Sequence, residues 1–252
     1  MSWFLRLGLL LLSVSVVLSA PAAEDCRLRV GWEPWKPYIY QQAGVFHGPE
    51  YELLQRLAAQ SGCELVYLEL PWARALRELS MGRLDLLYGA SRTAEREAFA
   101  RFSLAYRVEQ MQLVVRSGTP AFGSLRDWLA YSPARRFGLI RGFYYGAKLD
   151  PVLRDPQLAE RRLEVRSDLQ LLQLLQAGRI DAFWVEAFVA GDKIVQKGVE
   201  VRDLPDLVGE PMHLMFARHV PDITVERFDQ AIVRSLTQAA QRRRLAPAEP
   251  SR

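Results

Sequence analysis

The chain has 252 residues, half of them hydrophobic, and its 33 Lys and Arg residues exceed its 29 Asp and Glu residues by only four. Apart from Arg242–Arg244, basic and acidic residues are mixed along the chain, which argues against a nucleic-acid-binding surface because such a surface needs clustered positive charge. The length and apolar content allow one large core or two moderate ones.

The first 22 residues have the pattern of a secretory signal peptide. Arg6 precedes the almost wholly apolar run Leu7–Leu18, and Ala20–Ala22 matches the A-x-A cleavage pattern. A membrane anchor is the weaker interpretation, because the run is shorter than the roughly 20 residues that span a bilayer. Cys26 could accept a lipid, but the preceding residues are not the small apolar tripeptide that such processing needs. We therefore expect an exported, soluble protein in the periplasm.

Two cysteines each stand at the head of a strand-like run. Cys26 precedes the alternating segment Arg27–Val30, and Cys63 is followed closely by the apolar segment Leu65–Leu68. If these strands are parallel neighbours, both thiols lie at the same end of the sheet and within bridging distance. An oxidising compartment favours the bond. We predict a disulfide between the two cysteines; two buried free thiols are the alternative.

The helices predicted around these strands indicate parallel βαβ units. Glu50–Gln60 places apolar side chains on one face and ends at Gly62. Trp72–Met81 repeats the pattern and ends at Gly82, and a third strand is expected at Leu84–Tyr88. Strands separated by helices of this length form right-handed crossovers in a parallel sheet.

A second α/β unit is predicted later in the chain. The tetrapeptide Gly178–Asp181 stands between an apolar helix and an apolar strand, as Gly82–Asp85 does in the first unit. Further strands are expected at Arg136–Ile140 and Leu163–Val165. The similar junctions indicate an internal repeat; the alternative is that glycine ends helices in the same way in any α/β protein.

The segment Gly82–Tyr106 carries the functional interpretation. Its strand runs out through Gly89, where the backbone is free to approach another group, and Ser91 and Arg96 follow. An Arg beside hydroxyls and free amides at a strand end is suited to grip a carboxylate at two points. Taken alone, Arg96 would more often be a surface charge or a structural ion pair.

This segment resembles the G-x-[ST]-x-T-x-E-R and F-S-x-x-Y pattern of the extracellular solute-binding proteins of family 3. The resemblance implies a two-lobed α/β fold of the periplasmic binding protein type, with a mainly parallel, helix-flanked sheet in each lobe and a two-strand hinge. The ligand would be enclosed when the lobes close. The implied divisions are a signal peptide at residues 1–22, lobe one at 23–110 and 208–246, lobe two at 111–207, and a tail at 247–252.

Two strands and a helix complete the expected architecture. The β-favouring runs Gln112–Arg116 and Met212–Phe216 are expected to connect the lobes as the hinge. Phe228–Ala240 is expected to form a helix that packs back on lobe one.

The resemblance also implies ligand contacts. In the family, the Arg matched by Arg96 binds the α-carboxylate of an amino-acid ligand, and Ser91 matches a Ser or Thr that contacts the ligand. Near the first strand, Glu33 matches an acidic position and Trp35 an aromatic residue that flanks the ligand side chain. Glu186, five residues after the aspartate of the second tetrapeptide, matches the carboxylate that pairs with the ligand's α-ammonium, where Asp is commoner.

Two departures from the family pattern affect the expected ligand. Where the family has Gly-Thr-Thr or Gly-Ser-Thr, this chain has Phe143 and Tyr144 after Gly142, so the hydroxyls are lost and only backbone amides at a helix start would serve a carboxylate. Trp32 is bulky where the family is often small. With Trp72, for which ordinary core packing is an equal explanation, these rings predict an aromatic cleft that favours neutral, aromatic or basic ligand side chains.

Catalysis has little support in the sequence. The chain has no G-x-S-x-G, H-E-x-x-H or phosphate-loop motif, its three histidines lack metal-ligand spacing, and neither a metal nor a cofactor is expected. We therefore predict a non-enzymatic, monomeric periplasmic protein that captures an amino acid or related small zwitterion for an inner-membrane ABC permease. A ligand sensor for a membrane signalling partner, or a small periplasmic lyase that uses this fold as a cyclohexadienyl dehydratase does, are the alternatives.

Overall fold

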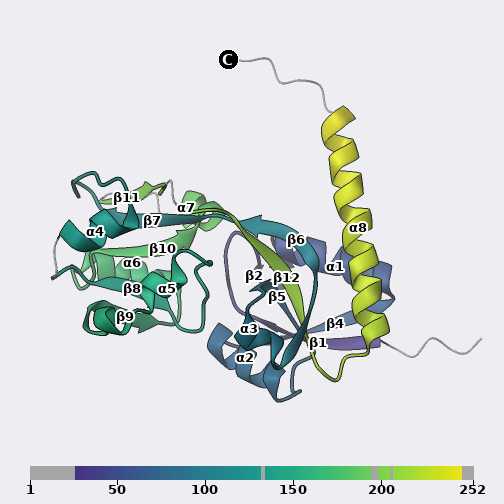
Figure 1. The fold of residues 1–252 in the computed structure, drawn as a ribbon. Helices are drawn as coiled ribbons and strands as arrows, with labels where there is room; N and C mark the ends of the chain where they lie inside the picture. The colour runs from purple at the N-terminus through teal and green to yellow at the C-terminus, as the bar shows by residue number, and fades with distance from the viewer. Residues whose placement is uncertain (1–25, 132–133, 194–197, 205–206, 246–252) are drawn as a thin grey trace, which may run out of the picture.

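The computed structural model describes residues 26–131, 134–193, 198–204 and 207–245. They form two lobes, each built on a five-stranded sheet, with chain segments passing between them (Figure 1). The predicted signal peptide and C-terminal tail lie outside the described residues. Among the described helices, none is long and apolar enough to cross a membrane.

Lobe one combines strands from the beginning and the end of the described chain, in the sheet order β4-β1-β5-β12-β6. Its strands are β1 (Cys26–Trp32), β4 (Cys63–Glu69), β5 (Leu86–Ser91), β6 (Ala100–Glu109) and β12 (Glu210–Ala217). Its helices are α1 (Pro49–Ser61), α2 (Trp72–Ser80), α3 (Ala94–Glu97) and α8 (Asp222–Leu245). A small hairpin adds β2 (Tyr40–Gln42) and β3 (Val45–His47).

Lobe two is formed by the middle of the chain, in the sheet order β11-β7-β10-β8-β9. Its strands are β7 (Met111–Arg116), β8 (Phe137–Ile140), β9 (Arg162–Val165), β10 (Ala182–Glu186) and β11 (Val199–Arg202). Its helices are α4 (Leu125–Tyr131), α5 (Asp150–Leu153), α6 (Asp168–Gln176), α7 (Ala187–Lys193) and a 3₁₀ helix at Pro156–Arg161.

The predicted helices of lobe one form where local signals placed them. Helix α1 begins with a proline in its first turn and ends at Gly62, whose left-handed backbone lets its amide bond to carbonyls of the last turn. The third strand begins at Leu86, two residues later than expected. The amides of Arg83 and Leu84 donate to the carbonyl of Glu78, so these residues belong to the turn that ends α2.

The two Gly-Arg-x-Asp junctions fold alike. Both glycines adopt left-handed backbone conformations, with φ of 71° and 68°. In lobe one the carboxylate of Asp85 accepts a hydrogen bond from the backbone amide of Arg29 at 2.7 Å. In lobe two Asp181 accepts one from the backbone amide of Arg136 at 2.8 Å. The sequence echo therefore corresponds to a shared turn and a shared strand contact.

The register of the first two parallel strands explains the cysteines. β1 pairs with β4 so that Cys26 lies opposite Cys63. Their Cα atoms are 4.5 Å apart and their sulfurs are bonded. The predicted disulfide is confirmed.

Each sheet combines the expected parallel pairings with antiparallel ones. β1 pairs in parallel with β4 and β5, and β8 pairs in parallel with β9 and β10. The antiparallel pairings involve β6, β7, β11 and β12. A single residue, Gln110, separates β6 in one sheet from β7 in the other, and β12 brings the chain back to lobe one (Figure 1). β12 and β7 thus run antiparallel to the parallel strands of their sheets, whereas β6, which is antiparallel to β12, runs in the same direction as β5.

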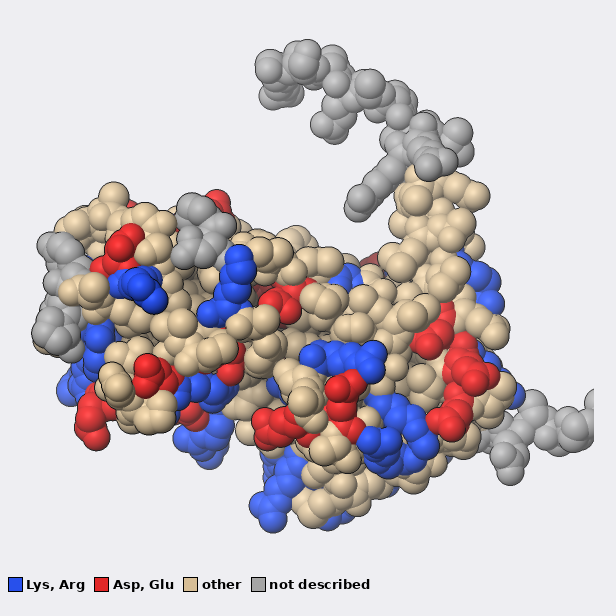
Figure 2. Space-filling view, viewed as in Figure 1, with Lys and Arg blue, Asp and Glu red and all other residues tan. Residues whose placement is uncertain are grey.

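Apolar side chains fill the space between each sheet and its helices. In lobe one, Leu54 of α1, Leu86 of β5 and Phe228 of α8 are fully buried in one core. Helix α8 packs against α1 and β6, as expected for the C-terminal helix. On the face drawn in Figure 2, positive and negative side chains are interspersed and neither sign forms a continuous patch.

Candidate functional site

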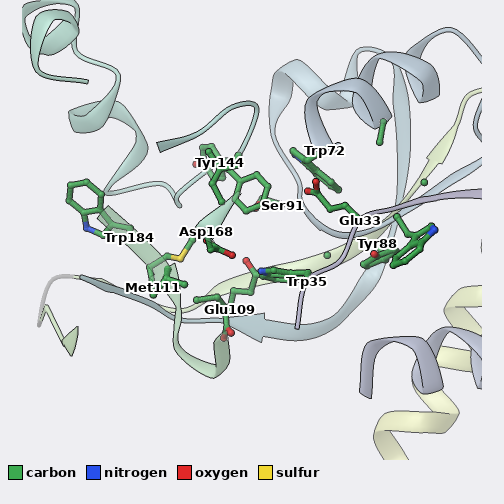
Figure 3. A pocket seen from close by; sticks show the side chains of 18 of the residues that line it. Glu33, Trp35, Trp72, Tyr88, Ser91, Glu109, Met111, Tyr144, Asp168 and Trp184 are labelled. Carbon is green, nitrogen blue, oxygen red and sulfur yellow. The ribbon is translucent and has the colours of Figure 1, made fainter. Parts of the chain in front are cut away.

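A hollow between the two lobes is the candidate ligand site. Counted out to its open mouth, it encloses about 760 Å³. Figure 3 shows Glu33, Trp35 and Trp72 of lobe one on one side, and Asp168 and Met111 of lobe two on the other. Both lobes therefore contribute to the same pocket.

All nine residues that the sequence predicted as ligand contacts line this pocket. They are Glu33, Trp35, Trp72, Gly89, Ser91, Arg96, Phe143, Tyr144 and Glu186. The fold brings together positions that are up to 153 residues apart in the chain (186 − 33). Contact of each with a ligand remains a prediction.

Arg96 projects from the short helix α3 into the pocket and is only 7% exposed. Its guanidinium donates to the backbone carbonyl of Ser91 at 2.9 Å and to that of Gly142 at 3.0 Å. Burial lowers the pKa of Arg96 to about 10, so the group stays charged at neutral pH. No carboxylate of the described residues forms an ion pair with it. The pocket therefore holds a buried positive charge that an anionic ligand group would neutralise.

Ser91 and Gly89 occupy the strand end that leads to Arg96. The hydroxyl of Ser91 is buried, and within the described part of the chain its partner is the sulfur of Met212, a weak acceptor at 3.9 Å. Gly89 has a left-handed backbone with φ of 58°. A Cβ atom added there would lie 2.8 Å from Nη2 of Arg107. The side chain of Arg107 thus makes a close approach at this glycine, where the sequence predicted one.

The aromatic loop after β8 differs from the expected helix start. The amide of Phe143 donates to the carbonyl of Ile140, and that of Tyr145 donates to the Asp150 side chain, so these two amides are already engaged. The next helix, α5, begins only at Asp150. Instead, the carbonyl of Gly142 faces lobe one and accepts from Arg96 and from the indole of Trp72. The loop presents an acceptor to the pocket where amide donors were expected.

Glu186 ends β10 at the start of α7. One of its carboxylate oxygens accepts from the amides of Phe188 and Val189 at 2.8 and 3.2 Å, which fixes the side chain at the helix N-terminus. The residue is 5% exposed, and its negative charge adds to the burial that raises the pKa of the Tyr38 hydroxyl. Its expected pairing with a ligand ammonium would use the carboxylate's remaining acceptor capacity.

Acidic side chains outnumber basic ones on the pocket wall. Besides Glu33 and Glu186, the lining includes Asp168 at the start of α6 and Glu109 at the end of β6. Burial raises the pKa of Glu33 to about 7, with the negative charge of Asp168 adding to the rise and the Trp72 backbone amide opposing it. Burial also raises the pKa of Glu109 to about 7, although its neighbour Arg107 acts in the opposite direction.

The sequence did not single out Asp168, Glu109 or Arg107. The sequence pattern places Asp168 in the first turn of a helix and Glu109 at the end of a strand. Neither pattern indicates that the side chain faces a cleft. Arg107 lies behind the wall, where its guanidinium is stacked near Tyr38 and Trp35. Among the described residues, no group of three or more His, Cys, Asp or Glu side chains is placed to hold a metal ion.

Comparisons with known proteins agree with this geometry. The sequence model of the bacterial extracellular solute-binding proteins, family 3, matches residues 28–241. A probable histidine-binding protein from Campylobacter jejuni is 23% identical over 218 residues, which cover 81% of this chain and 78% of that protein.

Two solved structures share the fold. An ancestral arginine-binding protein bound to arginine superposes with a TM-score of 0.72 at 21% identity, covering 84% of this chain and 93% of its own. The arginine-, lysine-, histidine-binding protein ArtJ from Geobacillus stearothermophilus superposes with a TM-score of 0.71 at 18% identity, covering 85% of this chain and 91% of its own.

Proposed function

The chain belongs to the family 3 bacterial extracellular solute-binding proteins, and from this premise we propose that it captures an amino acid between its two lobes for an ABC transporter. The observation that carries the proposal is the buried guanidinium of Arg96. It faces the pocket, and its two hydrogen-bond acceptors are neutral carbonyls. A ligand carboxylate would supply the missing negative charge through charge-assisted hydrogen bonds.

The opposite lobe supplies a complementary group for a zwitterion. Glu186 lies on lobe two and its carboxylate is oriented by two amides of α7. A ligand whose carboxylate is held by Arg96 and whose ammonium is held by Glu186 would contact both lobes, so its binding would favour the arrangement in which they touch.

The charge of the pocket supports a cationic ligand side chain. Arg107 offsets Glu109, and the α7 amides offset Glu186. Glu33 adds negative charge from lobe one, and the charge of Asp168 on lobe two is one reason why the pKa of Glu33 is high. A guanidinium, ammonium or imidazolium beside Glu33 would relieve this repulsion. The rings of Trp35 and Trp72 already have the guanidinium carbons of Arg107 and Arg96 at 5.5 and 5.6 Å, so a ligand cation would add cation–π contacts only at the faces left open to the pocket. Arginine, lysine and histidine are therefore the first ligands to test, and the ligands named for the relatives support the same choice.

The first experiment is thermal unfolding with a panel of amino acids, polyamines and small acids, after refolding to remove any carried-over ligand. Wild type is compared with Arg96→Ala and with Arg92→Ala, which removes an exposed Arg of the same segment that pairs with Glu97. A ligand at one hundred times its dissociation constant stabilises the folded state by about 2.7 kcal/mol.

We expect L-arginine or another basic amino acid to raise the midpoint of wild type and Arg92→Ala but not that of Arg96→Ala. If the same compounds shift wild type and Arg96→Ala equally, Arg96 does not hold the ligand. If an acidic amino acid is the best ligand, the assignment of a cationic side chain is wrong, whereas the receptor function stands.

The proposal places the protein in the periplasm as a monomer that releases its ligand to an inner-membrane permease and performs no chemical step. Uptake of labelled arginine should fall when the gene is deleted. Retained uptake together with loss of a ligand-dependent signalling response would favour a sensor instead. Conversion of panel compounds to products by the purified protein would oppose a purely binding role.

A further inference from the structure

Behind the pocket wall lies a buried cluster centred on Arg107, a residue of β6 that is not part of the pocket lining. Its side chain is 14% exposed. Nε donates to Glu50 at 3.0 Å, and Nη2 lies 2.8 Å from a carboxylate oxygen of Glu109. The second contact has ion-pair distance without an aligned N–H, so it is electrostatic rather than a good hydrogen bond. Arg107 thus joins the start of α1 to the last residue of β6.

The same guanidinium supports an aromatic wall of the pocket. Its carbon lies 4.6 Å from the ring centre of Tyr38 and 5.5 Å from that of Trp35. The two rings stack on each other with centres 4.6 Å apart, and Trp35 lines the pocket. Tyr38 also meets Phe188 of lobe two edge to face at 5.1 Å. The stack therefore reaches from the ligand site of lobe one to the first turn of α7.

Neighbouring residues leave space for this guanidinium and supply the acids that balance its charge. Gly89 leaves the space that Nη2 fills, because a Cβ atom there would be 2.8 Å from it. The hydroxyl of Tyr106 accepts from the Gly89 amide at 2.8 Å and donates to Glu50. Glu50 itself is 2% exposed. The charge of Arg107 is thus balanced by acids that are buried with it.

We infer that Arg107 is a positioning residue for the ligand side chain: it holds the Trp35–Tyr38 stack against the pocket and ties that stack to Glu109 at the crossing between lobes. A planar guanidinium can present its face to rings while its edges contact carboxylates. A lysine ammonium has no such face, so it would retain the charge and lose the stacking. The affinity readout of this inference rests on the proposed function, whereas its ligand-free readout does not.

The test compares Arg107→Met and Arg107→Lys with Arg101→Met, a matched control on the same strand whose arginine pairs with Asp222 at 3.0 Å. Without ligand, acrylamide quenching of tryptophan fluorescence is measured for each protein and for the same protein carrying Trp35→Phe. The difference between the two measurements gives the quenching of Trp35. With L-arginine as the probe, the dissociation constant is measured by calorimetry for each variant, alone and combined with Trp35→Ala.

We expect Arg107→Met to increase the quenching of Trp35 and to weaken L-arginine binding about tenfold, with Arg107→Lys between it and wild type and Arg101→Met unchanged. In the Trp35→Ala background, Arg107→Met should weaken binding less than about twofold, because the two residues act together. Equal weakening in both backgrounds with unchanged quenching would overturn the inference.

Two further results are informative. Removal of Arg107 leaves the buried acids Glu50 and Glu109 without their positively charged partner. If Arg107→Met does not fold for this reason, the triple variant that also carries Glu50→Gln and Glu109→Gln replaces it and is judged by the same criteria. If wild type binds neither L-arginine nor any other compound of the panel, the proposed function fails, and the quenching comparison alone decides the role of Arg107.

Discussion

Arg96 of lobe one donates a hydrogen bond to the carbonyl oxygen of Gly142 in lobe two, across 3.0 Å. The indole of Trp72 donates to the same oxygen at 3.1 Å. Two pocket residues of one lobe thus contact a single backbone atom of the other. Because the acceptor is a neutral carbonyl, a ligand carboxylate would compete well for these donors, which links ligand capture to the contact between lobes.

A larger residue at position 142 should therefore be unfavourable, because Gly142 lies at the contact between the two lobes. Its φ is 80°, and a Cβ atom there would already touch Ala73 and Leu76 of α2 at 3.4 Å. Gly118 has the same φ of 80°, and a Cβ atom there would have no atom of the described residues within 4 Å, which makes it a matched control. Both Gly142→Leu and Gly118→Leu should lose about 1 to 2 kcal/mol of stability from backbone strain.

Only Gly142→Leu should weaken binding of L-arginine, by about tenfold or more, because the longer side chain has no room unless the lobes part. Calorimetric titration of both variants checks this. Unchanged affinity in Gly142→Leu would mean that the contact between lobes is not needed for binding.

Removal of the Cys26–Cys63 bond should affect stability but not affinity. The cysteines are 37 positions apart, and the chain-entropy model gives roughly 4 kcal/mol for closing a loop of this size. They lie at the starts of β1 and β4, whereas the pocket is lined by residues at the other end of β1, such as Gly31 and Trp32. Urea unfolding of the double Cys→Ser variant, beside wild type with and without reductant, measures the loss. A large change in the L-arginine dissociation constant would show that the bridge shapes the pocket as well.

Much of the fold could be predicted because its signals are local. Gly62 ends a helix through its own left-handed backbone, and the Gly-Arg-x-Asp turn can be recognised from four residues. Predicting the disulfide required one further inference, that two cysteines at the heads of parallel neighbouring strands lie close together.

The missed part of the site depends on contacts that no local pattern records. The spacing from Gly82 to Arg96 places Arg96 near a strand end, but nothing near Gly142 indicates that its carbonyl turns toward lobe one. Likewise, Arg107 follows a matched tyrosine on a strand, and only the fold shows that it meets Glu50 and the ring of Tyr38. Residues 57 positions apart in the sequence (107 − 50) cannot be paired from periodicity.

The paired junction aspartates should differ in their contributions to stability. Asp85 has an 8% exposed side chain and accepts from the Arg29 side chain at 2.7 and 2.8 Å, whereas Asp181 is 29% exposed and accepts from Arg116 at 2.6 Å. We expect Asp85→Ala to lose about 3 kcal/mol, near the low end for a broken buried pair because Arg29 remains half-exposed. Asp181→Ala should lose about 1 kcal/mol. Equal losses in urea unfolding would contradict this ranking.

Acid should also weaken the Asp85 contact. Burial alone would raise the pKa of Asp85, but hydrogen bonds from Arg29 and His219 outweigh it and hold the pKa below its ordinary value of 3.8. The stabilisation is therefore present above the unfolded-state pKa and is lost as the pH falls through the folded-state pKa. The stability difference between wild type and Asp85→Ala should be full at pH 7 and shrink below about pH 4, which urea unfolding across this range would detect.

The affinity for a basic amino acid should rise with pH through neutrality. Burial and the charge of Asp168 raise the pKa of Glu33 to about 7, and a bound cation would favour the ionised carboxylate. Below pH 7, binding of L-arginine should therefore release protons, and the dissociation constant should fall by up to about tenfold from pH 6 to pH 8. Calorimetry in two buffers of different ionisation enthalpy measures the proton release directly.

Without ligand, the same raised pKa has the opposite consequence for stability. Because the folded state holds the Glu33 proton more tightly than the unfolded state, whose ordinary value is 4.5, this contribution is full below pH 4.5 and is lost as the pH rises toward 7. Glu33→Gln should reduce the pH dependence of L-arginine affinity and that of the stability without ligand. Glu109→Gln should remove a further part of both, because the pKa of Glu109 is also about 7. Glu64→Gln, at an exposed site, should change neither. If Glu33→Gln keeps the full pH dependence of L-arginine affinity, the ligand's positive charge does not lie beside Glu33, and the cation must be sought nearer to Glu186.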